Sequence, residues 1–165
     1  MKALPFETID CIFYDFDGVM TDNRVLVSQD GKESVFANRG DGYGVSLIKK
    51  MGIPQVIVST ETNNVVERRA EKLNIEVIHC VADKGATIID FCKKNGYDLQ
   101  KTVFIGNDLN DLPAFKIVGF TGAPRDAEEE ILQMADWVSS RKGGYGVIRD
   151  FYRFISSGSL KIKNL

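Results

Sequence analysis

Residues 9–21 read IDCIFYDFDGVMT, an apolar and β-prone run that passes into two aspartates and a glycine. The first six residues, 9–14, predict a buried strand, and Asp-Gly favours a turn directly after it. Asp15 and Asp17 leave this strand end two residues apart, so both can face one small volume. Two ionised carboxylates without a partner would be costly there, and a divalent cation with oxygen ligands relieves that cost. Taken alone, the pattern is equally typical of a solvated turn.

Outward from this strand, apolar runs alternate with amphipathic stretches. Short apolar runs predict further strands at 55–58, 76–78, 103–105 and 118–120. Helical spacing and terminal glycines predict helices at 41–51, 62–73, 83–95, 109–117, 126–134 and 147–155. Strands that alternate with helices predict an α/β fold, with a mainly parallel sheet covered by helices on both faces.

One segment departs from this alternation. Residues 24–27 and 33–37 flank the sequence Ser-Gln-Asp-Gly-Lys, in which Asp-Gly favours a hairpin turn. We therefore expect a protruding β-hairpin over 24–37, and a loop and helix over 141–157 near the end of the chain. A length of 165 residues fits a single domain over 1–165.

The composition excludes several classes of protein. Apolar residues make up 44% and charged residues 27%, which is ordinary globular usage rather than that of a disordered or fibrous chain. With 21 Lys and Arg against 23 Asp and Glu, the chain lacks the basic excess of a nucleic-acid binder. No apolar run approaches a membrane span, and the first residues lack a signal peptide's apolar stretch. Three cysteines without a CxxC pair predict a reduced, cytoplasmic protein with neither disulfides nor a zinc site.

Polar residues follow other predicted strands as well. In parallel sheets, ligands bind at the carboxyl ends of the strands. Ser59 and Thr60 follow one strand, residues 106–111 (GNDLND) follow another, and Lys84 opens a predicted helix. All of them can meet at the rim that holds the two aspartates. Helix caps, turns and an exposed lysine would explain each feature singly.

The order of these features is DxDGxxT, then a serine at a strand end, then a lysine, then GNDxND. It resembles the haloacid dehalogenase superfamily of phosphotransferases over roughly residues 9–112. The resemblance implies a three-layer α/β/α Rossmann-like fold. It implies that Asp15 is a nucleophile that forms an aspartyl phosphate and that Asp17 is the acid/base. Ser59 would then hydrogen-bond a phosphoryl oxygen, and Lys84 would balance the negative charge and hold the nucleophile.

A Mg²⁺ ion belongs to the same resemblance, since it removes the repulsion between a carboxylate nucleophile and a phosphate monoester. Its ligands would be Asp15, the backbone carbonyl of Asp17, and either Asn107 or Asp108. Many relatives have aspartate where this chain has Asn107, which offers a neutral oxygen and one less negative charge. Asp111 is then expected beyond the direct ligands. The resemblance assigns contacts with the phosphate to a further set of residues: Asp15, Gly18, Ser59, Thr60 and Lys84.

Many relatives carry a cap domain, for which this chain has no room, because a hairpin and one helix account for the residues between Asp15 and Ser59. Segments 39–44 (RGDGYG) and 141–150 (RKGGYGVIRD), with the hairpin, look like the capless subfamily that dephosphorylates 3-deoxy-ulosonate phosphates. Its members include eight-carbon KDO 8-phosphate phosphatases and nine-carbon KDN or neuraminate 9-phosphate phosphatases. The resemblance implies a homotetramer in which hairpins assemble the subunits and a neighbour completes each substrate pocket.

The carboxylate of such a substrate calls for arginine or lysine, and Arg68, Arg69 and Lys72 lie on the predicted helix after Ser59. A solvated charged face explains these three residues equally well. Eight-carbon enzymes often carry arginine two residues after the second-motif serine or threonine, whereas this chain has Glu61, whose carboxylate could accept bonds from sugar hydroxyls. We therefore expect a Mg²⁺-dependent phosphatase of a nine-carbon sugar-acid phosphate. The alternatives are an eight-carbon substrate, a catalytically silent oligomerisation module that accompanies a sugar-nucleotide synthetase, and a phosphotransferase.

Overall fold

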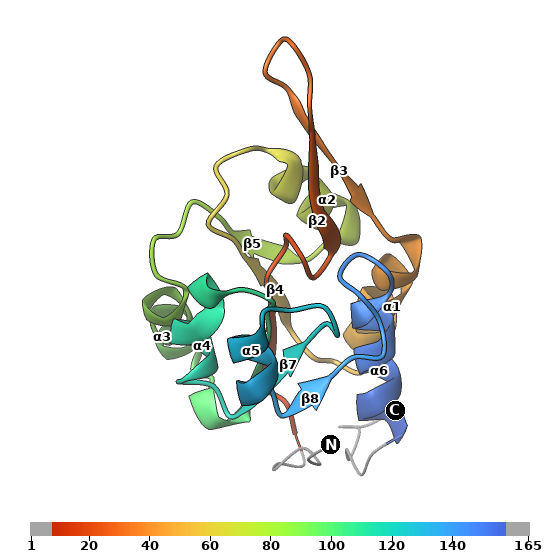
Figure 1. Ribbon diagram of the computed structural model, residues 1–165. Helices are drawn as coiled ribbons and strands as arrows, with labels where there is room; N and C mark the ends of the chain where they lie inside the picture. The colour runs from red at the N-terminus through yellow and green to blue at the C-terminus, as the bar shows by residue number, and fades with distance from the viewer. Residues whose placement is uncertain (1–7, 158–165) are drawn as a thin grey trace.

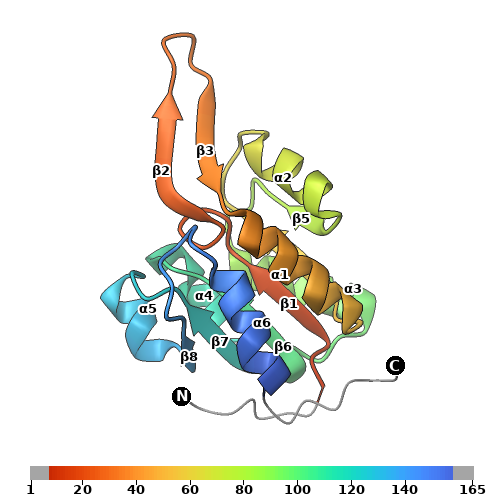
Figure 2. The same cartoon turned by 90° about the vertical axis from the view of Figure 1, so that its right-hand side faces the viewer.

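The computed structural model describes residues 8–157. Its central strands are β1 (Cys11–Tyr14), β4 (Gln55–Val58), β5 (Glu76–Ile78), β6 (Thr102–Ile105), β7 (Phe120–Ala123) and β8 (Trp137–Val138). They form one parallel sheet in the order β5-β4-β1-β6-β7-β8 (Figures 1 and 2). The predicted strand 9–14 therefore lies inside the sheet, and the predicted parallel α/β fold is confirmed.

Helices cover both faces of the sheet. They are α1 (Arg39–Lys50), α2 (Val65–Leu73), α3 (Lys84–Asn95), α4 (Leu112–Phe115), α5 (Glu129–Met134) and α6 (Val147–Ser157), with short 3-10 turns η1 (Leu99–Lys101) and η2 (Leu109–Asp111). Alternate residues of β1 point to opposite faces. Ile12 and Tyr14 pack with α1, α2 and α6, whereas Cys11 and Phe13 pack with α3, α4 and α5. The predicted three-layer arrangement is thus confirmed, and no helix within residues 8–157 is long and apolar enough to cross a membrane.

An antiparallel hairpin, β2 (Thr21–Val27) and β3 (Glu33–Ala37), follows the carboxyl end of β1 and projects away from the sheet (Figures 1 and 2). It confirms the predicted hairpin, although β2 begins at Thr21 rather than at residue 24. Gly31 has a φ of 79° in the turn, a conformation that favours glycine. The hairpin and α1 together fill the interval between β1 and β4, so the described part of the chain contains no cap domain.

Some short elements differ from the sequence-based expectations. Helix α2 begins at Val65 rather than residue 62, because the Asn63 side chain accepts a hydrogen bond from the Val65 N–H (3.1 Å) and holds the preceding residues in a turn. The strand predicted at 118–120 instead lies at 120–123, as β7. Gly119 packs against the backbone of η1 instead, where a Cβ atom would lie 1.9 Å from a carbonyl oxygen.

The side chain of Asp41, in the first turn of α1, caps α6 from a distant part of the chain. Its Oδ1 accepts hydrogen bonds from the backbone N–H groups of Ile148 (2.7 Å) and Arg149 (3.2 Å), and its Oδ2 accepts one from Gly146 (3.2 Å). Gly44 lets the two helices meet, since a Cβ atom there would lie 2.8 Å from the Arg149 nitrogen. Burial nevertheless raises the pKa of Asp41 to about 6, because the backbone amides offset only part of the lost hydration.

We expect Asp41→Asn to change the pH dependence of stability. A carboxyl whose pKa rises from 3.8 to about 6 on folding contributes stability that is present below pH 3.8 and lost as the pH rises through 6. Asparagine does not titrate in this range. As the pH falls from neutral to about 4, the unfolding free energy of the wild type should therefore rise relative to that of the variant, by about 1.4 kcal/mol for each unit by which folding raises the pKa of Asp41. Urea unfolding over this range, with Asp90→Asn as an exposed control, measures the difference. If this difference stayed constant with pH, the hydrogen bonds from the backbone N–H groups would fully compensate the hydration that Asp41 loses on burial.

Candidate active site

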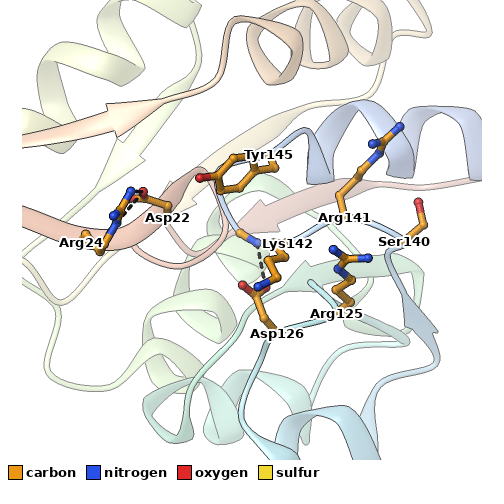
Figure 3. Close-up of a pocket in the computed structure, with 9 residues that line it drawn as sticks. Asp22, Arg24, Arg125, Asp126, Ser140, Arg141, Lys142 and Tyr145 are labelled. Carbon is orange, nitrogen blue, oxygen red and sulfur yellow. Dashed lines mark hydrogen bonds and ion pairs between the residues drawn. The ribbon is translucent and has the colours of Figure 1, made fainter.

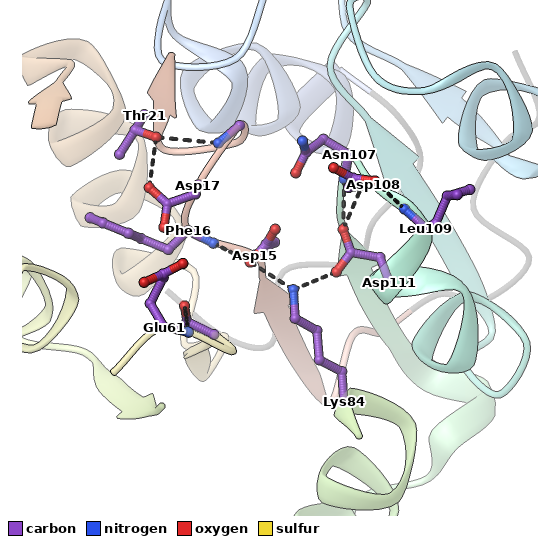
Figure 4. Close-up of polar contacts among 12 residues, drawn as sticks. Asp15, Phe16, Asp17, Thr21, Glu61, Lys84, Asn107, Asp108, Leu109 and Asp111 are labelled. Carbon is purple, nitrogen blue, oxygen red and sulfur yellow. Dashed lines mark hydrogen bonds and ion pairs between the residues drawn. The ribbon is translucent and has the colours of Figure 1, made fainter. Parts of the chain in front are cut away.

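The carboxyl ends of three adjacent strands bring the predicted residues to one rim of the sheet. Asp15 follows β1, Ser59 follows β4 and Gly106 follows β6, and these strands are neighbours in the order β4-β1-β6. Lys84 is the first residue of α3, directly after the N-cap residue Asp83. Figure 4 shows acidic and basic side chains converging from these segments. The structure therefore brings together the four features that the sequence placed at strand and helix ends.

Lys84 is buried between two carboxylates. Its Nζ lies 2.7 Å from Asp15 Oδ1 and 2.6 Å from Asp111 Oδ1, and only 1% of the residue is exposed. Burial acts to lower the pKa of Lys84, but the two carboxylates outweigh this effect and raise the pKa. The lysine therefore stays charged and holds Asp15 in place.

Asp111 organises the third strand end. Its Oδ2 accepts hydrogen bonds from the backbone N–H groups of Asn107 (2.8 Å) and Asp108 (3.2 Å), while its Oδ1 binds Lys84. Gly106 makes room for it, since a Cβ atom there would lie 2.4 Å from Asp111 Oδ2. Sequence reasoning placed Asp111 beyond the direct ligands but gave it no function, although its position at the end of GNDxND was the available signal. It is a positioning residue for Lys84 and for the turn after β6.

Asp15 is a nearly fully buried carboxyl group. Its Oδ1 accepts a hydrogen bond from the Phe16 N–H at 2.7 Å in addition to its contact with Lys84. Burial, with added repulsion from Asp111, raises the pKa of Asp15 to about 7, and Lys84 opposes the rise. An ionised Asp15 therefore favours further positive charge near its other oxygen, Oδ2.

The Asn107 carboxamide occupies that position. Its nitrogen donates hydrogen bonds to Asp15 Oδ2 (3.1 Å) and to the backbone carbonyl oxygen of Asp17 (2.8 Å), and turning the amide over would bring the side-chain oxygen to the same two distances. Neighbouring ligands of an octahedral Mg²⁺ with bonds of about 2.0–2.1 Å stand about 2.8–3.0 Å apart, so both the spacing and the oxygen chemistry fit this ion. Asn107 can thus satisfy these oxygens both with and without a cation.

The backbone around Asn107 distinguishes the two candidate metal ligands. Gly18, with φ of 86°, leaves room for the Asn107 carboxamide, because a Cβ atom there would lie 2.1 Å from Asn107 Nδ2. Asp108 instead accepts a hydrogen bond from the Leu109 N–H (2.6 Å) and caps η2, so this geometry does not support it as the third ligand. The donor set is one carboxylate, one carbonyl and one carboxamide. Accordingly, no group of three or more His, Cys, Asp or Glu side chains suited to a metal occurs among the described residues.

Asp17 lies in the turn after β1 and is partly buried. Burial raises its pKa, while the hydrogen bond that it accepts from Thr21 Oγ1 (3.1 Å) opposes part of the rise. Asp17 therefore holds a proton more readily than an ordinary aspartate, as an acid/base requires. Thr21 was not among the predicted site residues, although it is the last position of DxDGxxT. Its hydroxyl also accepts the N–H of Gly18 (3.2 Å), so the amide of Gly18, a predicted phosphate contact, is already engaged.

Ser59 is buried at the end of β4 with its hydroxyl hydrogen available. Its backbone N–H donates to the Ile78 carbonyl (2.9 Å), and its Oγ accepts the N–H of Glu61 (3.1 Å). The hydroxyl can therefore still donate to an anion. Thr60 follows it and is exposed to solvent.

The residues predicted to bind the sugar acid fall into two groups. Nη2 of Arg69 donates to the backbone carbonyl of Asn38 (2.9 Å), so Arg69 joins α2 to the start of α1 rather than reaching for a substrate. Arg68 and Lys72 are exposed on α2, and Arg68 is paired with a neighbouring glutamate at 3.0 Å. Arg68 and Glu61 both line a pocket of about 570 Å³ between the hairpin and α2. Arg68, Lys72 and Glu61 therefore remain open to a ligand, whereas Arg69 does not.

Comparison with known proteins identifies the family. A family model described as haloacid dehalogenase-like hydrolase matches residues 54–149, more than half of the chain. The chain belongs to this family. A solved structure from Streptomyces avermitilis, assigned to the HAD family of hydrolases, is 40% identical with a TM-score of 0.90, covering 96% of this chain and 91% of that one. The 3-deoxy-D-manno-octulosonate 8-phosphate phosphatase of Moraxella catarrhalis, solved with magnesium, phosphate and KDO, is 27% identical with a TM-score of 0.87, covering 92% and 88%.

Curated relatives narrow the family to a subgroup. The 3-deoxy-D-manno-octulosonate 8-phosphate phosphatase of Haemophilus influenzae is 29% identical over 87% of this chain and 81% of its own length. The N-acylneuraminate cytidylyltransferase of Oncorhynchus mykiss is 24% identical over 90% of this chain, which spans only 35% of that protein. The chain is a haloacid dehalogenase-type domain that is similar to the KDO 8-phosphate phosphatase-like subfamily, so the resemblance noted from the motifs is confirmed.

Proposed function

We propose that this protein is a Mg²⁺-dependent phosphomonoester hydrolase that works through an aspartyl-phosphate intermediate. The observation that carries the proposal is the environment of Asp15. Lys84 binds one of its oxygens, and the other faces the donor set completed by Asp17 and Asn107. A Mg²⁺ ion held by these oxygens would neutralise charge between the carboxylate and a phosphate.

The protein's own side chains account for the bond changes. A carboxylate oxygen of Asp15 attacks phosphorus in line, the bond to the leaving oxygen breaks, and Asp17 transfers its proton to that oxygen. Asp17 then takes a proton from a water molecule, which attacks the aspartyl phosphate and releases inorganic phosphate. Ser59 donates its hydroxyl to a phosphoryl oxygen, Lys84 balances the negative charge, and Thr21 keeps Asp17 oriented.

The substrate that we propose is a phosphorylated 3-deoxy-ulosonic acid, with nine carbons favoured over eight. The class is supported by the relative named for KDO 8-phosphate and by the neighbour solved with KDO. Nine carbons are supported by Glu61, which lines a pocket of about 150 Å³ with Asp17 and can accept bonds from extra sugar hydroxyls. N-acylneuraminate, named in the cytidylyltransferase relatives, is also a nine-carbon acid. Arg68 and Lys72 are the proposed partners of the substrate carboxylate.

We also propose a homotetramer assembled through the hairpins. Val25, Leu26, Val27 and Phe36 are between 52% and 72% exposed, and a cluster of apolar side chains on a protruding hairpin favours contact with another chain. A neighbouring subunit could then cover the open pocket beside Arg68 and complete the substrate site. The three free cysteines suit the reducing cytoplasm, and no nucleic-acid or membrane partner is proposed.

A catalytically silent oligomerisation module is the second candidate. It is favoured by the relatives in which a region like this chain forms about a third of a cytidylyltransferase. Against it stands the intact arrangement of Asp15, Asp17 and Lys84, since a silent module needs no buried lysine between two carboxylates.

A phosphate-release screen distinguishes these functions. We expect the protein to hydrolyse nine- and eight-carbon sugar-acid phosphates faster than simple sugar phosphates, and EDTA to lower turnover at least about 100-fold because the neutralising charge is lost. Restoring Mg²⁺ should restore activity. Absence of phosphate release from every monoester in the presence of Mg²⁺ would favour the silent module.

We expect Glu61→Arg to lower the ratio of nine-carbon to eight-carbon turnover about tenfold, because a cation replaces an acceptor for sugar hydroxyls. The ratio of kcat/KM values for KDN 9-phosphate and KDO 8-phosphate measures this. Glu67→Arg, on α2, is the matched control for the change of charge. An unchanged ratio in Glu61→Arg would remove Glu61 from the specificity argument.

A further inference from the structure

A second pocket, of about 470 Å³, borders the proposed phosphatase site and shares only Arg24 with the pocket that Asp17 and Glu61 line (Figure 3). Three segments form it: the start of β2, the loop after β7, and the loop over residues 140–145. None of its lining residues belongs to the predicted catalytic, metal or substrate set. They are Asp22, Arg24, Arg125, Asp126, Ser140, Arg141, Lys142, Gly143 and Tyr145.

The pocket is positively charged, although the whole chain has a net charge of -2. Its lining carries two more cations than carboxylates. Arg24 is already neutralised, because its Nε and Nη2 donate to Asp22 Oδ2 at 2.9 and 2.5 Å. The guanidinium groups of Arg125 and Arg141 and the ammonium group of Lys142 form no hydrogen bond or ion pair within residues 8–157. Cations gathered without partners favour the binding of an anion.

The backbone beneath these cations is firmly held. The Arg125 N–H donates a hydrogen bond to the Arg141 carbonyl (3.0 Å), so the two arginines lie on loop segments that run side by side. The Gly143 N–H donates to Asp126 Oδ1 (2.8 Å), which occupies one oxygen of that carboxylate. Gly143 also packs directly on the turn after β1, since a Cβ atom there would lie 2.0 Å from the Gly18 carbonyl oxygen. A ligand would therefore meet a pocket whose walls are already in place, which reduces the entropy cost of binding.

We propose that this pocket binds a small molecule that carries a phosphate group, independently of the phosphatase site. Arginine guanidinium groups bind phosphate oxygens in pairs, and a phosphate dianion matches the excess of two positive charges. The volume exceeds what a phosphate group needs, and Tyr145, which is 56% exposed, adds an aromatic surface beside it. The pocket can therefore also hold a sugar-sized group attached to the phosphate. This inference does not depend on the proposed hydrolase activity.

Residue-resolved labelling of arginines tests the proposal on the full-length protein in EDTA. The probes are inorganic phosphate, 6-phosphogluconate and gluconate, and the readout is modification by phenylglyoxal measured by peptide mass spectrometry. At several times its dissociation constant, phosphate should reduce labelling of Arg125 and Arg141 to below about a third. Labelling of Arg153, exposed on α6, should not change. Phosphate bound at Asp15 does not produce this pattern, because neither arginine belongs to that site.

The three probes identify the source of the phosphate group. Stronger protection by 6-phosphogluconate than by phosphate supports a phosphorylated sugar, and equal protection supports the phosphate group alone. Protection by gluconate as strong as that by phosphate would overturn the proposal. So would unchanged labelling of Arg125 and Arg141, or equal protection of Arg153.

Paired variants give a second measurement. The double variant Arg125→Gln/Arg141→Gln should lose more than half of the rise in Tm that phosphate produces in the wild type, whereas Arg153→Gln should keep all of it. A double variant that folds and keeps the full rise would contradict the proposal.

Discussion

Asp15→Asn is expected to lower phosphate release at least about 10⁴-fold while leaving the fold and the oligomer intact. An amide cannot displace the leaving group and form the aspartyl phosphate. The fold should persist because asparagine fills the same space and Asp111 still accepts the Lys84 ammonium group at 2.6 Å. Phosphate release under saturating substrate and Mg²⁺, with particle mass from light scattering, measures both parts.

The matched control is Asp90→Asn, an exposed carboxylate on α3, which should retain full activity. Wild-type protein quenched during turnover should carry an added phosphoryl mass, and Asp15→Asn should not. Turnover of Asp15→Asn within about tenfold of the wild type would refute the nucleophile assignment.

Lys84→Met is expected to destabilise the protein by about 3–5 kcal/mol and to reduce turnover strongly. Removal of the ammonium group leaves Asp15 and Asp111 buried without the cation that lies 2.7 and 2.6 Å from them. Lys93→Met, on the exposed side of α3, should change stability by less than about 0.5 kcal/mol. Urea unfolding of each variant in EDTA measures the difference.

The double variant Lys84→Met/Asp111→Asn separates charge from packing. It removes one of the two uncompensated carboxylates, so it should recover part of the stability lost in Lys84→Met. It should not recover turnover, because Lys84 still cannot balance the charge at Asp15. A loss below about 1 kcal/mol in Lys84→Met would mean that the buried ion pairs are not needed for the fold.

Elements with local signals were predicted well. Strands β4 and β5 occupy 55–58 and 76–78, where short apolar runs predicted them. Helix α3 begins after Asp83, whose side chain accepts the Ala86 N–H (3.0 Å), and ends at Gly96, whose φ is 71°. Caps of this kind involve residues that are close in the chain, so the sequence around them contains the whole interaction.

Elements that depend on distant contacts were predicted poorly. Strand β8 has two residues, too few for any periodicity, and exists because Trp137 pairs with Gly122 on β7. The predicted helix 109–117 is divided into η2 and α4. Asp108 and Asp111 form a capping box that starts this segment as a 3-10 turn, and Asp111 is held in that position by Lys84.

By itself, the sequence determined a parallel α/β sheet and placed Asp15, Ser59 and Lys84 at ends of elements that meet on one rim. It could do so because strand and helix ends are encoded by nearby residues, and parallel strands present their ends to the same side. Only the tertiary structure decided that Asn107 faces the two oxygens near Asp15, that Arg69 is bound to Asn38, and that a basic pocket forms from three separate segments. Those distances depend on strand register and on the paths of loops through the packed molecule, which no local pattern specifies.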